Sequence, residues 1–204
     1  LVRKPEALII DDERSTVEAL AKLVSREGFD VRTAIDLASA RSEIEQSVPD
    51  VVLCDLVLPD GDGTELLVDF KKHPQVETIL VTANATVSSA VEALRLGAYD
   101  YLTKPVDVPR LRTILGHLRR NLAIRQDVAA LRRQLREMGR FGGLVGTSQA
   151  MQEVFDLIER VAPTDTTVLV VGASGTGKEL VAETIHSLSG RSDAEFVPIN
   201  CGAV

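Results

Sequence analysis

The sequence predicts an α/β fold: a doubly wound sheet of five parallel strands, then a long linker helix, then a second, partial α/β segment. Three observations predict it. Short apolar runs alternate with helical periodicities over residues 1–107, leucines recur at helical spacing over residues 108–140, and a glycine-rich loop follows an apolar run at residue 172. Strands that alternate with helices form parallel sheets with both faces covered. Five such units suit a flavodoxin-like domain.

The elements of the first domain follow from these runs. Buried strands are expected at residues 7–10, 29–34, 51–54, 78–81 and 99–102. The first helix carries Val17, Leu20 and Val24 on one face and ends before Gly28. Further helices are expected at residues 37–47, around 66–70 and at 87–96. Residues 59–63, which read Pro-Asp-Gly-Asp-Gly, are expected to form a loop.

The segment 108–140 differs from its neighbours in charge. It carries nine Arg against two acidic residues, whereas residues 1–107 carry 11 basic against 20 acidic residues and residues 141–204 carry 3 against 8. Its apolar residues step by three and four in two runs: Leu111, Leu115, Leu118, Leu122, and Val128, Leu131, Leu135, Met138. Such heptad spacing predicts a helix about 50 Å long that pairs with a partner, most simply its copy in a homodimer. The arginines favour a solvated face over a nucleic-acid site, because no aromatic residues interleave them.

The last segment contains a candidate phosphate loop. A helix is expected at 149–161, a strand at 167–171, a helix at 179–188 and a strand at 196–199. Residues 172–178 match G-x-x-x-x-G-K in the required strand-to-helix context. The backbone N–H groups of such a loop hold phosphates, and Lys178 would reach the β- and γ-phosphates of ATP. The candidate ATP-binding residues are Gly172, Ala173, Ser174, Gly175, Thr176, Gly177, Lys178 and Glu179.

Composition excludes several classes of protein. With 45% hydrophobic and 26% charged residues, the chain can bury a core. Two cysteines do not make a disulfide scaffold, so a reduced, cytoplasmic setting is expected. No membrane is expected, because no apolar run approaches the roughly 18 residues of a membrane span and no signal peptide opens the chain. The chain begins with Leu1 rather than Met, so we expect it to be part of a longer protein.

Acidic, basic and hydroxyl residues follow the expected strands of the first domain. Asp11, Asp12, Asp55, Thr82 and Lys104 all fall at carboxyl ends, where doubly wound sheets bind ligands. Ionising all three neighbouring carboxylates costs free energy unless a cation lies between them, and oxygen ligands with room for water suit Mg²⁺. A Lys and a Thr hydroxyl suit phosphoryl oxygens, and an Asp can form an aspartyl phosphate. The set predicts Mg²⁺-dependent phosphoryl transfer to Asp55.

These residues resemble the receiver domain of two-component response regulators over residues 5–120. The resemblance is carried by Asp11-Asp12, Asp55 before Leu56-Val57-Leu58-Pro59 and Gly63, Thr82-Ala83, Gly97-Ala98-Tyr99-Asp100-Tyr101 and Lys104-Pro105. It implies that Asp55 accepts the phosphoryl group of a sensor histidine kinase. It also implies that Asp12 binds Mg²⁺ directly and Asp11 through water, with the backbone carbonyl of Val57 as a further ligand.

The same resemblance implies a conformational switch. Lys104 would bind a phosphoryl oxygen, Thr82 would move onto the phosphoryl group, and Tyr101 would follow into the space that is vacated. The move would reshape the face of the fourth helix and fifth strand. In such domains the Lys104–Pro105 peptide bond is expected to be cis. Val57 and Asn84, two residues beyond Asp55 and Thr82, lie at the expected mouth of the pocket.

The last segment resembles the AAA+ module of NtrC-family activators of sigma-54 RNA polymerase, over residues 144–204. The resemblance is carried by residues 172–179, by Leu144-Val145-Gly146-Thr147-Ser148 and Met151, and by Ile185-His186 and Phe196–Cys201. It implies that Val145 and Gly146 lie near the adenine of ATP. Glu179 departs from the Ser or Thr of the general phosphate-loop motif. No Walker B strand end, sigma-54-contacting loop, arginine finger or helix-turn-helix follows. We therefore expect these 204 residues neither to hydrolyse ATP competently nor to bind DNA specifically.

The expected organisation is a receiver core at 1–107, its last helix continuing as a coiled-coil linker at 108–140, and the start of an AAA+ ATPase domain at 141–204. The expected function is a response regulator whose phosphorylation at Asp55 changes a receiver and linker dimer. In the full protein this change would control an ATPase that acts on sigma-54 RNA polymerase at enhancer DNA.

Two alternatives stay open: a constitutive dimerisation module, and a phosphatase-like enzyme that forms an aspartyl phosphate. Against the second, Val57 occupies the position where such enzymes usually carry a general acid. For these 204 residues we do not expect a stand-alone P-loop NTPase, because the downstream motifs are missing.

Overall fold

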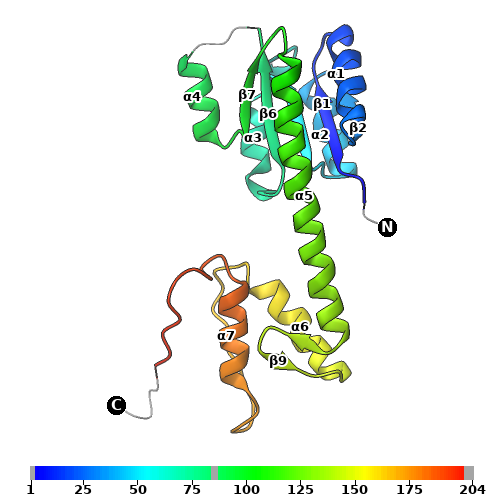
Figure 1. The fold of residues 1–204 in the computed structure, drawn as a ribbon. Helices are drawn as coiled ribbons and strands as arrows, with labels where there is room; N and C mark the ends of the chain where they lie inside the picture. Colours follow the sequence, from blue (N-terminus) through cyan, green and yellow to red (C-terminus); the bar gives the residue numbers. More distant parts are fainter. Residues whose placement is uncertain (1–2, 84–86, 200–204) are drawn as a thin grey trace. The chain divides into compact units, whose positions relative to one another are not determined.

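A parallel sheet of five strands organises the first part of the chain in the computed structural model, which describes residues 3–83 and 87–199 (Figure 1). The strand order is β2-β1-β3-β6-β7, and every pairing is parallel. The strands are β1 (Glu6–Ile10), β2 (Asp30–Ala34), β3 (Val51–Asp55), β6 (Glu77–Thr82) and β7 (Asp100–Thr103). This confirms the doubly wound α/β fold that the sequence predicts.

The chain forms two compact units, residues 1–126 and 127–204. The boundary falls inside one 30-residue helix, α5 (Val108–Glu137). Its first turns belong to the first unit because Leu111, Leu115 and Leu118 are buried there. Within the described residues, no helix is both long enough and apolar enough to span a membrane.

Helices cover both faces of the sheet in the first unit, because alternate strand residues point to opposite faces. Ala7 and Ile9 of β1 face a core shared with α1 (Arg14–Arg26) and the start of α5. Leu8 and Ile10 face a second core shared with α2 (Leu37–Gln46), α3 (Glu65–Asp69) and α4 (Val87–Leu96). Strands buried on both sides explain why the sequence shows continuous apolar runs here rather than alternation.

Local signals fix the ends of several elements. The side chain of Asp36 caps α2 by accepting a hydrogen bond of 2.7 Å from the Ser39 N–H. Gly97 follows the last residue of α4 with φ +105°, a conformation that suits glycine. Residues 59–63, expected as a plain loop, instead supply the turn and second strand of a short hairpin, β4 (Val57–Leu58) with β5 (Gly61–Asp62). A single 3-10 turn, η1 (Phe70–Lys72), follows α3.

The second unit has a smaller core. A hairpin of β8 (Arg140–Phe141) and β9 (Leu144–Val145) packs with α6 (Gln149–Val161) and α7 (Lys178–Leu188). The rings of Phe141 and Phe155 stack with centroids 4.9 Å apart. Arg136, in the last turn of α5, connects that helix to α6 through ion pairs with Asp156 and Glu159.

Two strand predictions for this unit are wrong. Residues 167–171 and 196–199 have no strand structure, and Leu169 and Val171 are 85% and 84% exposed. A strand requires a neighbouring backbone with which to exchange hydrogen bonds. Within the described part of this unit, the only paired strands are the two of the β8–β9 hairpin.

Candidate functional site

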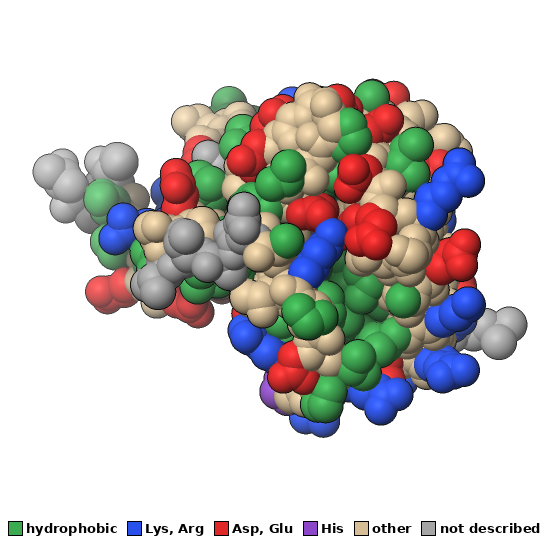
Figure 2. Space-filling view, turned by 90° about the horizontal axis from the view of Figure 1, so that it is seen from above, with side chains coloured by type: hydrophobic (Ala, Val, Ile, Leu, Met, Phe, Trp, Pro, Cys, Tyr) green, Lys and Arg blue, Asp and Glu red, His purple; other side chains and the backbone are tan. Residues whose placement is uncertain are grey.

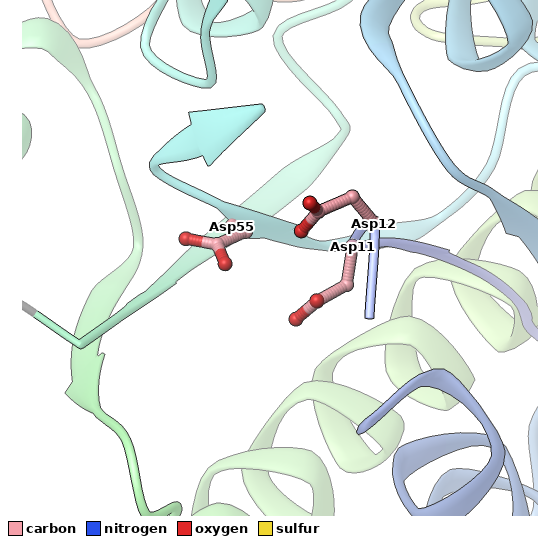
Figure 3. A group of neighbouring side chains, drawn as sticks. All are labelled: Asp11, Asp12 and Asp55. Carbon is pink, nitrogen blue, oxygen red and sulfur yellow. The ribbon is translucent and has the colours of Figure 1, made fainter. Parts of the chain in front are cut away.

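Three carboxylates meet at the carboxyl ends of two neighbouring strands, β1 and β3. Asp11 and Asp12 directly follow β1, and Asp55 is the last residue of β3 (Figure 3). One oxygen from each carboxylate lies within 4.8 Å of the others. Asp11 and Asp55 are buried, whereas Asp12 is exposed. The register that pairs Ile10 with Cys54 brings these residues together at the point where the strand order reverses, as doubly wound sheets do for ligands.

Lys104 brings a positive charge to these carboxylates from the loop after β7. Its Nζ lies 2.7 Å from Oδ2 of Asp11 and also contacts Oδ2 of Asp55. Burial by itself would lower the pKa of Lys104, but the close contacts of its ammonium with the Asp11 and Asp55 carboxylates outweigh burial, and the pKa lies above its ordinary value. The lysine therefore stays protonated at neutral pH. The backbone positions it through the Lys104 N–H, which donates to the Thr82 carbonyl at 2.7 Å, and the Lys104–Pro105 bond is cis as expected.

The backbone around Asp55 is closely packed. Oδ1 of Asp55 accepts a 3.1 Å hydrogen bond from the N–H of Val57, whose own side chain is 66% exposed. Gly63 lies so near that a Cβ there would come within 2.2 Å of the Asp55 carbonyl oxygen. Burial and the neighbouring charge of Asp55 raise the pKa of the Cys54 thiol beyond the neutral range, so this cysteine is inert core. Asn84, expected at the pocket mouth, lies outside the described residues.

The two expected switch residues are both buried. Thr82 ends β6 at 1% exposure, and Tyr101, on the neighbouring strand β7, is 7% exposed. The Tyr101 hydroxyl lies 3.1 Å from Oγ of Ser89 in α4. Sequence reasoning missed Ser89. The sequence feature that could have indicated it is the position of Ser89, a hydroxyl residue in the first turn of the helix that follows β6.

A groove beside the carboxylates was also missed. It has a volume of about 590 Å³ and runs between α1 and the start of α5, lined by Leu20, Leu23, Val106 and Leu111 with Lys104 at its edge. Figure 2 looks onto this end of the first unit: acidic side chains gather near the centre of the face, and a hydrophobic area lies next to them. Leu20 and Leu23 come from α1, Leu111 from α5, and Lys104 and Val106 from the loop before α5, so residues far apart in the sequence line one groove.

The candidate phosphate loop leads into α7. Gly175 and Gly177 have φ of +80° and +86°, and Gly177 caps the helix. The Nζ of Lys178 bonds to the carbonyls of Gly172 and Ala173 at 3.0 and 2.7 Å. Thr176 Oγ1 donates to the Ala173 carbonyl at 2.8 Å, and Ser174 and Glu179 are exposed. The residues of the motif therefore form one compact turn at a helix N-terminus, the geometry that suits anions.

Val145 and Gly146, the residues expected near adenine, lie at the end of the β8–β9 hairpin. The Gly146 N–H donates to the Gly139 carbonyl at 2.7 Å. The hairpin packs against the helix that follows the phosphate loop, since a Cβ at Gly142 would come within 2.6 Å of the Thr184 side chain. Val145 is 77% exposed beside this contact.

Comparison with known families agrees with this architecture. Residues 7–116, more than half of the chain, match the family "Response regulator receiver domain". Residues 144–204 match the "Sigma-54 interaction domain". The chain belongs to the response regulator receiver family, and a receiver followed by a sigma-54 interaction domain is the arrangement of NtrC-type, sigma-54-dependent response regulators.

Individual relatives share this arrangement. The transcriptional regulatory protein ZraR of Salmonella typhimurium is 39% identical over 98% of this chain and 45% of its own length. The crystal structure of NtrX from Brucella abortus in complex with ADP is 34% identical, with a TM-score of 0.56 over 99% of this chain and 45% of that one. The beryllofluoride-activated NtrC4 receiver domain dimer, 31% identical, gives a TM-score of 0.54 over 57% of this chain and 98% of that one. The chain spans less than half the length of the curated relatives it matches.

Proposed function

We propose that Asp55 accepts a phosphoryl group from a sensor histidine kinase in the cytoplasm, and that this event controls a dimer of the chain. The observation that carries the proposal is the ring of Asp11, Asp12, Asp55 and Lys104 at the ends of β1, β3 and β7. Four such groups at one end of a sheet supply a nucleophile, metal ligands and a cation for phosphoryl oxygens. No general acid stands two residues after Asp55, where Val57 lies, so the site suits a phosphoryl acceptor better than a phosphatase.

The donor set fits Mg²⁺, because it offers hard oxygen ligands and keeps Asp12 open to water. Asp11, Asp12, Asp55 and the backbone carbonyl of Val57 would hold the ion. When bound, it supplies charge neutralisation for the phosphoryl oxygens. The residues of the chain do the rest: a carboxylate oxygen of Asp55 forms the new O–P bond while the N–P bond to the kinase histidine breaks. The leaving imidazole keeps the N–P electron pair.

Lys104, Thr82 and Tyr101 would respond to the new phosphoryl group. Lys104 already bonds to Asp55. Its ammonium can therefore bond to an oxygen of the new phosphoryl group without leaving the site. The Thr82 hydroxyl would bind a second oxygen. Tyr101 is buried and contacts Ser89, so a movement of Thr82 beside it would be transmitted to α4.

We also propose the organisation and role of the whole protein. Residues 1–107 form the receiver core, residues 108–140 its last helix and a coiled-coil linker, and residues 141–204 the start of an AAA+ ATPase domain. Residues 172–179 would bind the phosphates of ATP, with Val145 and Gly146 near the adenine. The support is the compact loop at the start of α7 and the similarity to NtrX, whose structure holds ADP. In the longer protein, this ATPase would act on sigma-54 RNA polymerase at enhancer DNA.

The test is phosphoryl transfer from a small phosphodonor such as phosphoramidate, with and without Mg²⁺, followed by intact-protein mass spectrometry. We expect the wild type to gain one phosphoryl group only with Mg²⁺, and Asp55→Asn to gain none. Asp69→Asn is the matched control, because it removes an exposed carboxylate of α3 that is not part of the site. Equal labelling of wild type and Asp55→Asn would overturn the proposal.

A further inference from the structure

The expected switch residue Tyr101 lies on a strand with one free edge. β7 is the last strand of the sheet, and among the described residues no further strand pairs with its outer side. An edge strand has backbone N–H and C=O groups that lack a strand partner. These groups need other partners at Tyr101, because this residue is buried and has little access to water. The groups that lie on this edge therefore decide how firmly the Tyr101 backbone is held.

Two side chains supply the partners of the Tyr101 backbone. The Tyr101 N–H donates a hydrogen bond of 2.7 Å to Oδ1 of Asp100. The Tyr101 carbonyl accepts a hydrogen bond of 3.2 Å from Nη2 of Arg110. The same Nη2 donates to Oδ1 of Asp100 at 2.8 Å. These three hydrogen bonds, which we call the Tyr101 anchor, therefore form a closed set that occupies both backbone groups of the residue.

Arg110 is suited to this contact by its chemistry and its place. It lies in the first turn of α5, where its own N–H donates to Oδ1 of Asp107 at 3.1 Å. Its planar guanidinium carries several donors in fixed directions, so one side chain can bond to a carboxylate and a carbonyl together. In the sequence, Arg110 is one of nine arginines of segment 108–140 and has no feature that sets it apart.

The effect of this contact is local rather than a gain in overall stability. The side chains of Arg110 and Asp100 are 52% and 26% exposed, and ion pairs between exposed side chains add little to stability. The backbone of Tyr101, in contrast, receives both of its edge bonds from this pair. The Tyr101 side chain is held separately, by the contact of its hydroxyl with Ser89.

We propose that Arg110 is a positioning residue for the switch. Through the Tyr101 anchor it fixes the backbone of β7, so that phosphorylation of Asp55 moves the Tyr101 side chain and not the strand. Without the anchor, the side chain would take up both of its positions even when Asp55 is unmodified. The inference rests on the proposed switch at Tyr101 and adds to it the group that holds the moving residue. Because Arg110 belongs to α5, the anchor also ties the switch strand to that helix.

The experiment observes the tyrosine rings by NMR. The chain contains two tyrosines, Tyr99 and Tyr101, so ring-labelled ¹³C-tyrosine gives one set of signals for each, and Tyr99→Phe assigns them. We expect the Tyr101 signals of wild type to shift when beryllofluoride and Mg²⁺ are added. In Arg110→Gln they should be displaced or broadened before the addition, and the shift on addition should fall below about half of the wild-type shift, because the two positions are already mixed.

Arg112→Gln is the matched control. Arg112 lies two residues further along α5, is 55% exposed and forms an ion pair of 3.2 Å with Glu27. This variant should unfold within a few degrees of Arg110→Gln, because each loses one exposed ion pair, yet its Tyr101 signals should match those of wild type. Arg110→Lys should recover most of the wild-type shift, since its ammonium can still donate to the Asp100 carboxylate.

The outcomes separate the anchor from the switch. Tyr101 signals in Arg110→Gln that match wild type with and without beryllofluoride would overturn the proposal. The same displacement in Arg112→Gln would also overturn it, because the effect would then belong to any lost ion pair of the helix. Displaced signals in free Arg110→Gln, together with a wild type that does not respond to beryllofluoride, would contradict the proposed switch and leave the anchor standing.

Discussion

The proposed acceptor carboxylate is fixed in place by its backbone neighbours as much as by charge. The Val57 N–H and the Lys104 ammonium each bond to one oxygen of Asp55, so both oxygens have a defined position. Gly63 lies against the Asp55 carbonyl, where no side chain fits. The sequence identifies the charged residues of this site, but the requirement for glycine at position 63 follows from a close approach that only folding creates.

We predict that Gly63→Ala damages both stability and phosphoryl acceptance. The added Cβ would lie 2.2 Å from the Asp55 carbonyl oxygen and 2.9 Å from Cys54 Sγ, so β3 or the β4–β5 hairpin must shift. Thermal unfolding should show a loss of about 1–3 kcal/mol, and phosphoramidate labelling should slow markedly. Gly116→Ala is the control, because nothing lies within 4 Å of its added Cβ. That helix substitution should stabilise by up to about 1 kcal/mol. A Gly63→Ala variant that labels normally would contradict the close approach.

The exposed side chain of Val57 should protect the aspartyl phosphate. Its N–H bonds to Asp55 while its apolar side chain is 66% exposed beside the carboxylate, which hinders an attacking water. We predict that the phosphorylated wild type decays severalfold more slowly than phosphorylated Val57→Asn, whose amide can hydrogen-bond to water. The half-life of the phosphoprotein, followed by mass spectrometry, checks this. Val68→Asn, at a similarly exposed valine of α3, should not change the half-life. Equal half-lives for the wild type and the Val57→Asn variant would refute it.

At the scale of elements, most boundaries follow from local chemistry, while others depend on distant residues. The side chain of Asp36 caps α2 locally, but two more N–H groups of the same helix, those of Leu37 and Ala38, donate to Asp60 at 2.8 and 2.9 Å. Asp60 lies 23 residues away from Leu37, in the turn between β4 and β5. The sequence marks Asp60 as a loop residue, and only the tertiary fold makes it part of a helix cap.

We predict a pH-dependent contribution of Asp60 to stability. The hydrogen bond from Leu37 is the main cause that holds the pKa of Asp60 below its ordinary value of 3.8. Because the pKa is lowered in the folded state, the stabilisation is complete above the unfolded value and is lost as the pH falls through the folded one. Asp60→Asn should therefore unfold at lower denaturant concentration at pH 7, and its deficit should shrink below about pH 4. Glu18→Gln, which removes an exposed carboxylate of α1, is the control. A deficit that does not change with pH would contradict the role of the charged form.

At the scale of the whole molecule, the chain combines a complete receiver sheet with a smaller second unit. The first unit buries two apolar layers around five paired strands. The second unit buries one small cluster around Phe141 and Phe155 and leaves Leu169 and Val171 exposed. The run 167–171 predicts a strand because its residues are mostly apolar and β-branched. A strand, however, forms only where another strand lies beside it to share hydrogen bonds.

We predict that the state of Asp55 changes the assembly of the chain. Light scattering with beryllofluoride and Mg²⁺ should show a change in mass or hydrodynamic size for wild type and none for Asp55→Asn. The reason is that Tyr101 lies on β7, the strand paired with β6 and Thr82, and contacts Ser89 of α4, so that a movement at Thr82 can pass to the surface. A change shared by both proteins would show that it does not act through Asp55. No change in either would favour a constitutive dimer.

The sequence by itself determined the fold class, the candidate acceptor aspartate, its carboxylate partners and the phosphate loop. These depend on residue type and strand order, which a sequence displays directly. Only the tertiary structure decided the contacts of Ser89 with Tyr101, of Gly63 with Asp55 and of Asp60 with α2. It also decided which half of the leucine pattern in α5 is buried and which is exposed. Both halves repeat apolar residues in steps of three and four, and their difference lies in what the rest of the chain packs against them.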